Sequence, residues 1–327
     1  MENSIFVVME TAGGAIKNVG LEMLSPAKEI AAAKGLKTAA VIIGSGVDEA
    51  AKQAANYGAD CVITVDAPEY ETYSSDEYAA ALAQLCEKYS PEAVFIGATP
   101  NGKDLAPRVA AKLNTGCAAD AVGVKLGDDG KIVFTCPVFG GNILADNVID
   151  TKPQMGTIRG GVFKKAEVSD ASANVVKETV TLKDGDVKTK IADVVKEISE
   201  SVNLEDAEVI VAGGRGMGSP ENFALVKELA DLLGGVVGAT RAPIESGWIS
   251  KAHQIGQSGK IVAPKLYIAC GISGATQHVT GMVGSDYIVA INKDEDAPIF
   301  EIANVGIVGN VLQVIPAMIE EIKKMRA

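Results

Sequence analysis

The chain has 327 residues, of which 47% are hydrophobic and 22% charged, and its formal net charge is −12. This length favours two domains over one, and the composition is typical of a globular protein with a sizeable core. The negative charge argues against nucleic acid or an anionic membrane surface as the main partner, but it leaves room for a local site for one small anion.

The five cysteines are scattered, and no two of them have CxxC spacing. An odd, unclustered set does not favour a disulfide framework, a zinc site or an iron–sulfur site. The N-terminal sequence MENSIFVVMET lacks a basic segment followed by an apolar one, and no apolar run approaches ~20 residues. We therefore expect a cytoplasmic protein with no signal peptide, no membrane insertion and no metal site.

The first part of the chain alternates short apolar runs with amphipathic helical patterns. The expected strands are SIFVVME, KTAAVIIGS, CVITVDA and EAVFIGAT. This order predicts a parallel sheet with helices on both faces. From about Ala121 to Val168 the segments VGVKL, KIVFTCPVF and QMGTIRGGVF alternate with turn signals such as GDDGK and FGGN, which predicts hairpins at the edge of the first domain.

Residues 169–204 are charged and poor in aromatic side chains. We expect a strand that returns to the first domain, then a connecting helix and the linker. A second unit begins near Ala207 with the strand EVIVAGG and a helix that has Ser219 as its expected N-cap and Pro220 at N1. The remaining expected elements are the strands VVGATRAP, KLYIACGIS, SDYIVAINKD and IFEIANV and the closing helix NVLQVIPAMIEEIKKM.

The expected fold class is therefore α/β, with two doubly wound domains whose sheets are mainly parallel. We place the first domain at residues 1–190, the linker at 191–204 and the second domain at 205–327. In such sheets, ligands bind beyond the carboxyl ends of the strands, and the unusual residues of the second domain are found there.

Two loops of the second domain resemble phosphate sites without matching a standard motif. GGRGMGS combines glycines with Arg215, which suits a phosphate, although a tight turn with a solvated arginine explains it equally well. Its glycine spacing is not GxGxxG, so a nicotinamide site is unsupported. QSGK lacks the upstream glycine of a Walker A loop, and Lys260 is followed by Ile261, so an NTPase is disfavoured and a polar turn remains the alternative.

Other strand ends carry further candidates. In GISGATQH, small residues allow an anion or a planar ring close to the backbone, and His278 falls in the first helical turn; a capping histidine without a ligand is the alternative. Thr240 and Arg241 end another strand, where an arginine indicates an anionic or flat partner. Asn292 ends a third strand, in a position that suits ribose or phosphate but also fits a surface loop.

Catalysis by protein side chains has little support. The chain has only two histidines, no HExxH and no Ser–His–Asp order with a nucleophile elbow. We therefore assign no catalytic residue. Several glycine loops and a few cations around one crevice favour a long anionic dinucleotide.

At these residues the sequence resembles the alpha (large) subunit of electron-transfer flavoproteins. The resemblance covers nearly the whole chain and is carried by QIGQSGKIVAPKLYIACGISGATQHVTGM, by IVAINKDEDAPIF and by TKPQMGTIRGGVF at residues 151–163. It implies a heterodimer in which the first domain packs on a beta subunit. It also implies that the second domain is a Rossmann-like domain that binds FAD.

The resemblance also implies which residues contact the cofactor. Arg215 corresponds to a contact with phosphate or ribose, Thr240 and Arg241 to contacts at the isoalloxazine ring, and His278 to a donor at its N1/C2 edge. The remaining positions are Ile255, Gly256, Gln257 and Ser258 along the flavin edge, Gly271, Ser273, Gly274, Ala275, Thr276 and Gln277 around the pyrophosphate, and Asn292 and Asn310 in the adenosine half. Thr240 stands where serine is common, and Asn310 where aspartate is common.

The implied activity is electron transfer between a dehydrogenase, such as an acyl-CoA dehydrogenase, and an acceptor. A cation over the ring and a donor at its edge stabilise negative charge on the flavin and raise its potential. Two forms stay open: a simple carrier with AMP in the beta subunit, and an electron-bifurcating complex with a second FAD that uses NADH and ferredoxin. The alternative from another class is a nucleotide-binding or regulatory module without redox chemistry.

Overall fold

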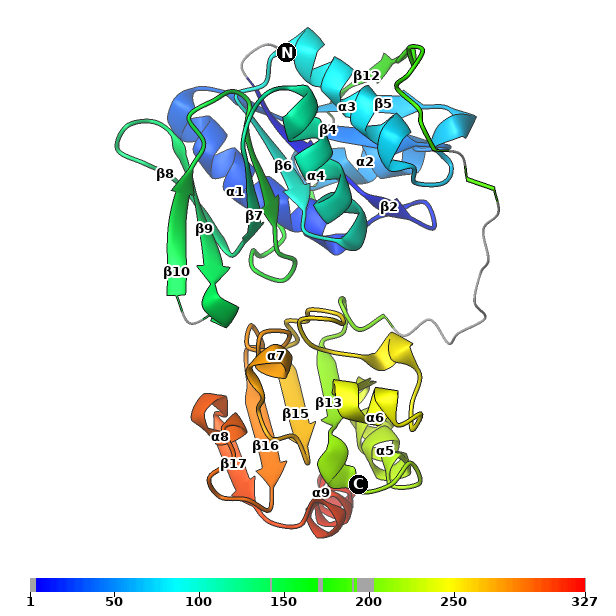
Figure 1. Ribbon diagram of the computed structural model, residues 1–327, viewed down its shortest axis with the longest axis vertical. Helices are drawn as coiled ribbons and strands as arrows, with labels where there is room; N and C mark the ends of the chain where they lie inside the picture. Colours follow the sequence, from blue (N-terminus) through cyan, green and yellow to red (C-terminus); the bar gives the residue numbers. More distant parts are fainter. Residues whose placement is uncertain (1–3, 142, 170–172, 190, 193–202, 327) are drawn as a thin grey trace. The chain divides into compact units, whose positions relative to one another are not determined.

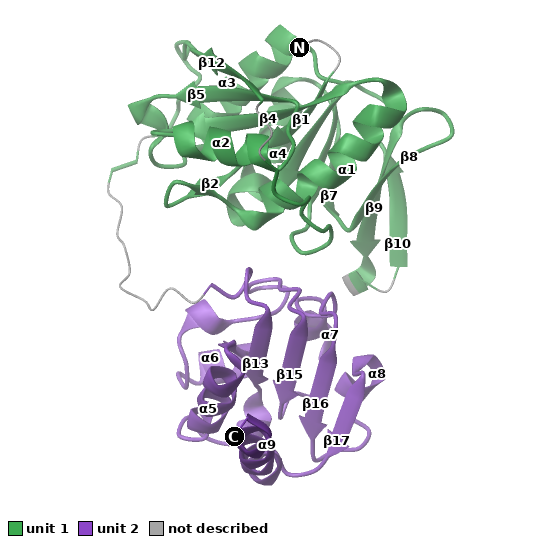
Figure 2. Ribbon diagram, turned by 180° about the vertical axis from the view of Figure 1, so that it is seen from behind, with its two compact units in different colours: residues 1–194 green, residues 195–327 purple. Residues whose placement is uncertain are grey.

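The computed structural model describes all residues except 1–3, 142, 170–172, 190, 193–202 and 327 (Figure 1). The chain divides into two compact units, residues 1–194 and 195–327 (Figure 2). Each unit has its own hydrophobic core clusters and is described by itself. The boundary falls within the predicted linker at 191–204, and the helix expected ahead of the second unit lies outside the described residues.

Unit 1 is built on a seven-stranded sheet in the order β12-β5-β4-β1-β6-β11-β7, and all neighbouring strands are parallel. The strands are β1 (Ser4–Val8), β4 (Lys37–Gly44), β5 (Cys61–Asp66), β6 (Ala93–Gly97), β7 (Cys117–Ala121), β11 (Gln154–Ile158) and β12 (Asn174–Glu178). The chain runs from β1 to β4 and β5 on one side and then crosses to β6 on the other. The predicted return strand is confirmed as β12.

Helices cover both faces of this sheet, as predicted. The helices α1 (Asn18–Lys34) and α2 (Asp48–Asn56) share one core cluster, and α3 (Ser75–Tyr89) and α4 (Pro100–Lys112) share the other. Along β1, Ile5 and Val7 belong to the first cluster and Phe6 to the second. Successive side chains of a strand point to opposite faces, so a continuous apolar strand contributes to both layers.

A second, antiparallel sheet flanks the first core cluster. It has the order β10-β9-β8 and consists of β8 (Gly123–Leu126), β9 (Ile132–Val138) and β10 (Ile143–Val148). The hairpins predicted around GDDGK and FGGN are confirmed. The segment QMGTIRGGVF was predicted with these hairpins, and this is wrong: it supplies β11, between β6 and β7. All five residues of β11 are buried, as expected for a strand whose two faces are both covered.

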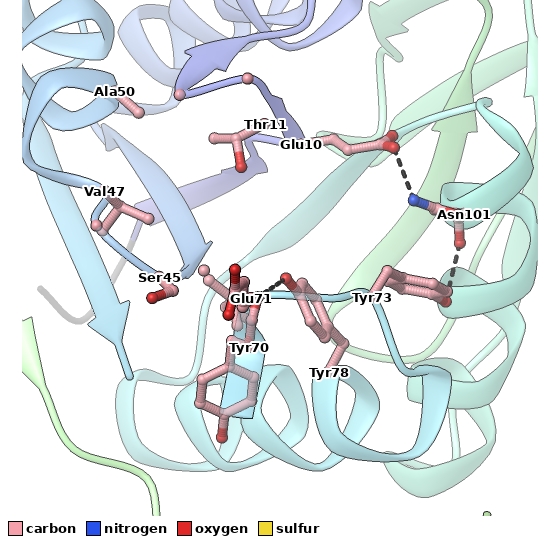
Figure 3. A pocket seen from close by; sticks show the side chains of 15 residues that line it. Glu10, Thr11, Ser45, Val47, Ala50, Tyr70, Glu71, Tyr73, Tyr78 and Asn101 are labelled. Atoms are coloured by element: carbon pink, nitrogen blue, oxygen red, sulfur yellow. Dashed lines mark hydrogen bonds between the residues drawn. The ribbon is translucent and has the colours of Figure 1, made fainter. Parts of the chain in front are cut away.

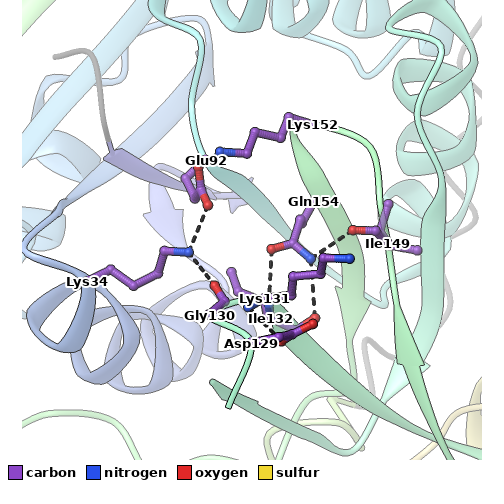
Figure 4. A network of polar contacts seen from close by, with 9 residues as sticks. All are labelled: Lys34, Glu92, Asp129, Gly130, Lys131, Ile132, Ile149, Lys152 and Gln154. Atoms are coloured by element: carbon purple, nitrogen blue, oxygen red, sulfur yellow. Dashed lines mark hydrogen bonds and ion pairs between the residues drawn. The ribbon is translucent and has the colours of Figure 1, made fainter. Parts of the chain in front are cut away.

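Polar contacts join the antiparallel sheet to the parallel one (Figure 4). The buried Gln154 accepts a hydrogen bond from the Ile132 N–H at 3.0 Å and donates one to the Ile149 carbonyl at 2.9 Å. Lys34 on α1 pairs with Glu92 at 2.8 Å and also donates to the Gly130 carbonyl, in the turn between β8 and β9. The position of the antiparallel sheet is therefore fixed by buried polar groups as well as by apolar packing.

Unit 2 contains a five-stranded parallel sheet in the order β14-β13-β15-β16-β17. The strands are β13 (Val209–Gly213), β14 (Val236–Ala239), β15 (Leu266–Cys270), β16 (Ile288–Asn292) and β17 (Val305–Val308). Helices α5 (Phe223–Leu233) and α9 (Val311–Arg326) pack on one face. The other face is covered by the short helices α7 (Thr276–Val279) and α8 (Ile299–Ile302) and by residues 255–262.

The second doubly wound domain is thus confirmed, but two of its local predictions are wrong. Helix α5 begins at Phe223 and Ser219 does not cap it, because residues 219–222 form a turn in which Asn222 Nδ2 donates to the Met217 carbonyl at 2.6 Å. The segment IFEIANV is not one strand: α8 occupies its first residues, and β17 starts only at Val305. Among the described residues, no helix is both long and apolar enough to cross a membrane.

Candidate functional site

The strand order of unit 2 places one point of the sheet in the position that ligands favour in open α/β folds. From β13 the chain first adds β14 on one side and then β15 on the other, so the loops after β13 and β15 leave the sheet side by side. Backbone hydrogen bonds join these loops, from Gly214 N to the Cys270 carbonyl and from Gly216 N to the Gly271 carbonyl, both at 2.9 Å. The carboxyl edge of β13 and β15 is therefore the candidate site.

A cavity of about 520 Å³ opens at this edge. The predicted residues that line it are Arg215, Thr240, Arg241, Ile255, Gly256, Gln257, Ser258, Ser273, Ala275, Gln277 and His278. They come from four separate segments of the chain, so the fold brings together most of the candidates that the sequence suggested. Four further lining residues were not predicted, namely Gly214, Ala242, Gln254 and Ile272.

Five predicted residues do not line the cavity. Gly271, Gly274 and Thr276 belong to the same loop after β15, and only their neighbours face the cavity. Asn292 donates from Nδ2 to the Ile272 carbonyl at 2.9 Å, so it braces that loop from behind. Asn310 accepts from Leu312 N at 3.0 Å and precedes α9, which gives it the position of a helix N-cap.

The glycines of these loops serve contacts within the protein. A Cβ atom on Gly214 would lie 2.3 Å from the Gly271 carbonyl oxygen, and one on Gly274 would lie 2.2 Å from Ile299 N. At Gly256 it would meet the Gln277 carbonyl oxygen at 2.8 Å, and φ there is +140°. The pattern that suggested close approach of a phosphate thus also reports close approach of loop to loop.

The positive charge at the cavity comes from two exposed arginines. Arg241 opens the short helix α6 (Arg241–Glu245), where its Nε is 2.7 Å from Oε1 of Glu245; the two side chains are 69% and 60% exposed. Arg215 lies in the turn η3 (Arg215–Met217) and has no ion-pair partner within the described part of the chain. An exposed ion pair is weak, so an anionic ligand can compete with Glu245 for Arg241.

His278 is buried at the wall of this cavity, and both of its ring nitrogens are engaged by the protein. Nδ1 lies 3.0 Å from the Ile255 carbonyl and Nε2 lies 3.0 Å from the Tyr267 hydroxyl. Burial lowers the pKa of His278 to about 4, against the opposing effect of the Ile255 hydrogen bond. The imidazole is therefore neutral at physiological pH. It has no spare N–H to donate, so the donor role implied by the resemblance is not present in this arrangement.

Gln254 is the lining residue with a clear role that the sequence did not suggest. Its buried side chain donates from Nε2 to the Ser258 hydroxyl at 2.9 Å, which leaves that hydroxyl its own hydrogen to donate. The other histidine, His253, is buried with Nδ1 2.7 Å from the Val237 carbonyl. It ties the turn η4 (Lys251–His253) to β14 and does not line the cavity.

Unit 1 also has a cavity, of about 190 Å³, at the carboxyl ends of β1 and β4 (Figure 3). No arginine or lysine lines it, and the charged lining residues are Glu10 and Glu71. The Glu10 carboxylate is already occupied: it accepts from Asn101 at 2.9 Å and pairs with Lys17 at 2.6 Å. This lining does not suit a phosphate, so the two cavities differ in charge even though both lie at the carboxyl ends of parallel strands.

The fold and the unit 2 cavity define a class: an α/β protein whose second domain holds an anionic, nucleotide-like ligand at a strand switch point. The lining offers two guanidinium groups, hydroxyls and amides, and its one histidine is neutral and hydrogen-bonded on both sides. Such a lining can bind, orient and stabilise negative charge. It offers no activated nucleophile.

Comparison with known proteins identifies the family. Residues 5–183 match the electron transfer flavoprotein domain, and residues 203–283 match the electron transfer flavoprotein FAD-binding domain. The chain is 48% identical to the electron transfer flavoprotein subunit alpha of Thermoanaerobacterium thermosaccharolyticum, over 98% of both chains. It is 46% identical to the subunit of that name from Megasphaera elsdenii, over 98% of this chain and 97% of the relative. The chain belongs to the electron transfer flavoprotein alpha subunit family, whose cofactor is FAD.

Two further comparisons give different kinds of information. A relative from Anaerotignum propionicum, named acryloyl-CoA reductase electron transfer subunit beta, is 41% identical over 98% of this chain and 95% of its own. A solved thiamine diphosphate-dependent decarboxylase from Rhodococcus jostii RHA1 covers 97% of this chain and 59% of its own, at 11% identity and a TM-score of 0.20. That likeness carries no argument about fold or function.

The unit 2 cavity fits FAD by its chemistry. The cofactor carries a diphosphate, for which Arg215 and Arg241 supply positive charge, and polar ring and ribose atoms, for which Thr240, Ser258 and Ser273 supply hydroxyls. Ile255 and Ile272 add apolar surface for a flat ring. The predicted cofactor is confirmed at the level of the family, and the contacts of single residues remain predictions.

Proposed function

We propose that this chain is the alpha subunit of a heterodimer that holds FAD in the unit 2 cavity and carries electrons between a dehydrogenase and an acceptor. The observation that supports this most is the lining itself: two exposed arginines meet hydroxyl and amide side chains around one cavity, with no activated nucleophile. FAD supplies the redox chemistry when bound. The chain binds it, orients it and sets the charge around it.

Within this proposal, each lining residue has a defined task. Arg241 and Arg215 offset the negative charge of the ligand, and the pair with Glu245 opens when the ligand arrives. Gln257, Ser258 and Ser273 direct hydrogen bonds to polar ligand atoms. His278 contributes a neutral, apolar wall, because both of its nitrogens are already paired.

We assign the partners by chemical class. Unit 1 packs on a beta subunit, and an acyl-CoA dehydrogenase or reductase exchanges electrons with the assembly. The printed name of the Anaerotignum relative, an electron transfer subunit of an acryloyl-CoA reductase, supports this class. The cytoplasmic location expected from the sequence belongs to the same proposal.

The test is to purify the chain together with its beta subunit, count its flavins by absorption and mix it with a reduced acyl-CoA dehydrogenase. The proposal expects a yellow protein whose flavin absorbance bleaches on mixing and recovers when an acceptor is added. A colourless preparation that takes up no added FAD would favour the non-redox, nucleotide-binding alternative. Bound flavin that never exchanges electrons with any dehydrogenase would contradict the carrier role.

The finer form of the proposal is an NADH-dependent electron-bifurcating complex with ferredoxin as the second acceptor. It rests on whether the beta subunit holds AMP or a second FAD. Two flavins per heterodimer that NADH reduces would support it. A single flavin that NADH leaves oxidised would identify a simple carrier.

A further inference from the structure

A buried hydrogen-bonded chain runs behind the unit 2 cavity. Tyr267, on β15, is fully buried, and its hydroxyl is 3.0 Å from His278 Nε2. The other ring nitrogen of His278 lies 3.0 Å from the carbonyl of Ile255, the first residue of the segment 255–258 that lines the cavity. Tyr267 itself does not line the cavity. The three residues therefore connect the central sheet to a wall of the ligand site.

The chemistry of the partners determines where the protons lie. A carbonyl oxygen only accepts, so Nδ1 of His278 must carry the hydrogen that it donates to Ile255. In a neutral imidazole the other nitrogen is then an acceptor, so the Tyr267 hydroxyl donates to Nε2. Without this hydroxyl, Nε2 would be a buried acceptor with no partner, which is unfavourable.

The segment that this chain reaches is held from the same side by further contacts. Gln257 N donates to the Gln277 carbonyl at 2.7 Å, next to His278 in sequence. A Cβ atom on Gly281 would lie 2.5 Å from Gly256 Cα, so the two backbones are in close contact. The orientation of His278 thus affects the placement of the whole lining segment, because α7 and residues 255–258 pack backbone against backbone.

We propose that Tyr267 is a positioning residue of the FAD site: it holds His278 in the Nδ1–H form and, through the Ile255 carbonyl, fixes the lining segment 255–258. This inference deepens the proposed function and rests on it. It assigns the ligand-binding effect of His278 to the segment that it holds, instead of to a hydrogen bond from its ring to the flavin. The substitution Tyr267→Phe isolates the claim, because it removes only the hydroxyl.

The protonation pattern can be read directly, because the chain has only two histidines. The chain is expressed with ¹⁵N-labelled histidine, combined with its unlabelled beta subunit, and the two signals are assigned with His253→Gln and His278→Gln. The proposal expects His278 to show a protonated Nδ1 and an acceptor Nε2 from pH 6 to 8, with and without FAD. A protonated Nε2 in both states would overturn it.

The second arm measures FAD affinity and the Nε2 resonance in Tyr267→Phe. We expect the resonance to move and the dissociation constant for FAD to rise about tenfold, as for the loss of one buried hydrogen bond. The matched control is Tyr287→Phe, an exposed tyrosine of the same unit, which should change neither. In a double-mutant cycle, Tyr267→Phe should add little to His278→Gln, because the two residues act in series.

The outcomes separate this inference from the proposed function. Unchanged affinity and an unchanged Nε2 resonance in Tyr267→Phe would overturn the positioning role while FAD binding stands. Fully additive effects in the cycle would overturn it too, because the two residues would then act independently. If the chain bound no FAD at all, the carrier proposal and the inferred effect on affinity would both fail, while the resonances would still establish the state of His278.

Discussion

Arg241 is the residue on which the electrostatics of the site depend most. It is exposed and held only by Glu245 on its own helix turn, so it is free to meet an anionic ligand. A charge-assisted hydrogen bond contributes ~1.5–3 kcal/mol, and ~1.4 kcal/mol corresponds to a tenfold change in affinity. We predict that Arg241→Ala weakens FAD binding about ten- to hundredfold and lowers the flavin potential, as measured by fluorescence titration and by reduction against a reference dye.

The control for this prediction is Glu245→Gln, which removes only the competing carboxylate. Exposed ion pairs contribute ~0–1 kcal/mol, so folding stability should hardly change, and FAD should bind equally well or more tightly. Equal affinity and equal potential in Arg241→Ala and the wild type would show that the arginine does not face the ligand.

His278 predicts a specific pH dependence of stability. Its pKa in the folded protein is about 4 because of burial, below the ordinary value of 6.5. As the pH falls through this window, the unfolded chain takes up a proton and the folded chain does not, so the free energy of unfolding decreases. We predict a loss of up to about 3 kcal/mol between pH 7 and pH 4, seen in urea unfolding curves and reduced in His278→Gln. Parallel pH profiles for the two proteins would refute this.

At the residue scale, the sequence located the site better than it located the roles. Arg215, Arg241 and His278 were predicted to share one cavity, and they do. The hydrogen bonds of His278 to Tyr267 and Ile255 could not be predicted, because they depend on how two loops pack. Asn310 has only a capping role in the described structure, since an asparagine before a helix looks the same in sequence whether it caps or binds.

At the scale of elements, the join between the two sheets of unit 1 is the most testable feature. The side chain of Gln154 is 3% exposed and satisfies both Ile132 N–H and the Ile149 carbonyl. Removing it leaves buried groups without partners, at a cost of ~1–3 kcal/mol. We predict that Gln154→Ala lowers the free energy of unfolding of unit 1 by that amount, as measured by hydrogen exchange of the amides in β9.

The matched control is Lys131→Ala, in the same network. The Lys131 side chain is 43% exposed and its partner Asp150 is 82% exposed, so their pair should contribute little. Equal losses from the two substitutions would mean that the join is not made by the buried glutamine.

Element types followed from sequence patterns wherever a segment is long and periodic. The parallel strands of unit 1 and the closing helix α9 were predicted because apolar runs and helical periods are local signals. β11 was misplaced because its burial depends on β6 and β7, its neighbours in space. The start of α5 was missed because a serine–proline pair marks a turn as readily as a helix start.

At the scale of the whole molecule, two separate units divide the work. Each has its own parallel sheet and its own core clusters, and the positively charged cavity lies in unit 2 alone among the described cavities. A ligand that binds the folded state stabilises the unit that holds it. FAD should therefore slow hydrogen exchange in the strands of unit 2, β13 and β15 above all, and leave β1 and β4 of unit 1 unchanged. Equal protection of both units would contradict this division.

The central claim is that the unit 2 cavity of this chain holds a redox-active FAD. The most direct test is a reductive titration of the purified heterodimer, compared with a variant that carries both Arg215→Ala and Arg241→Ala, with flavins counted in each. The account predicts that the wild type has one more reducible FAD per heterodimer than the variant, whatever the beta subunit binds. The same number of reducible flavins in both proteins would contradict the account.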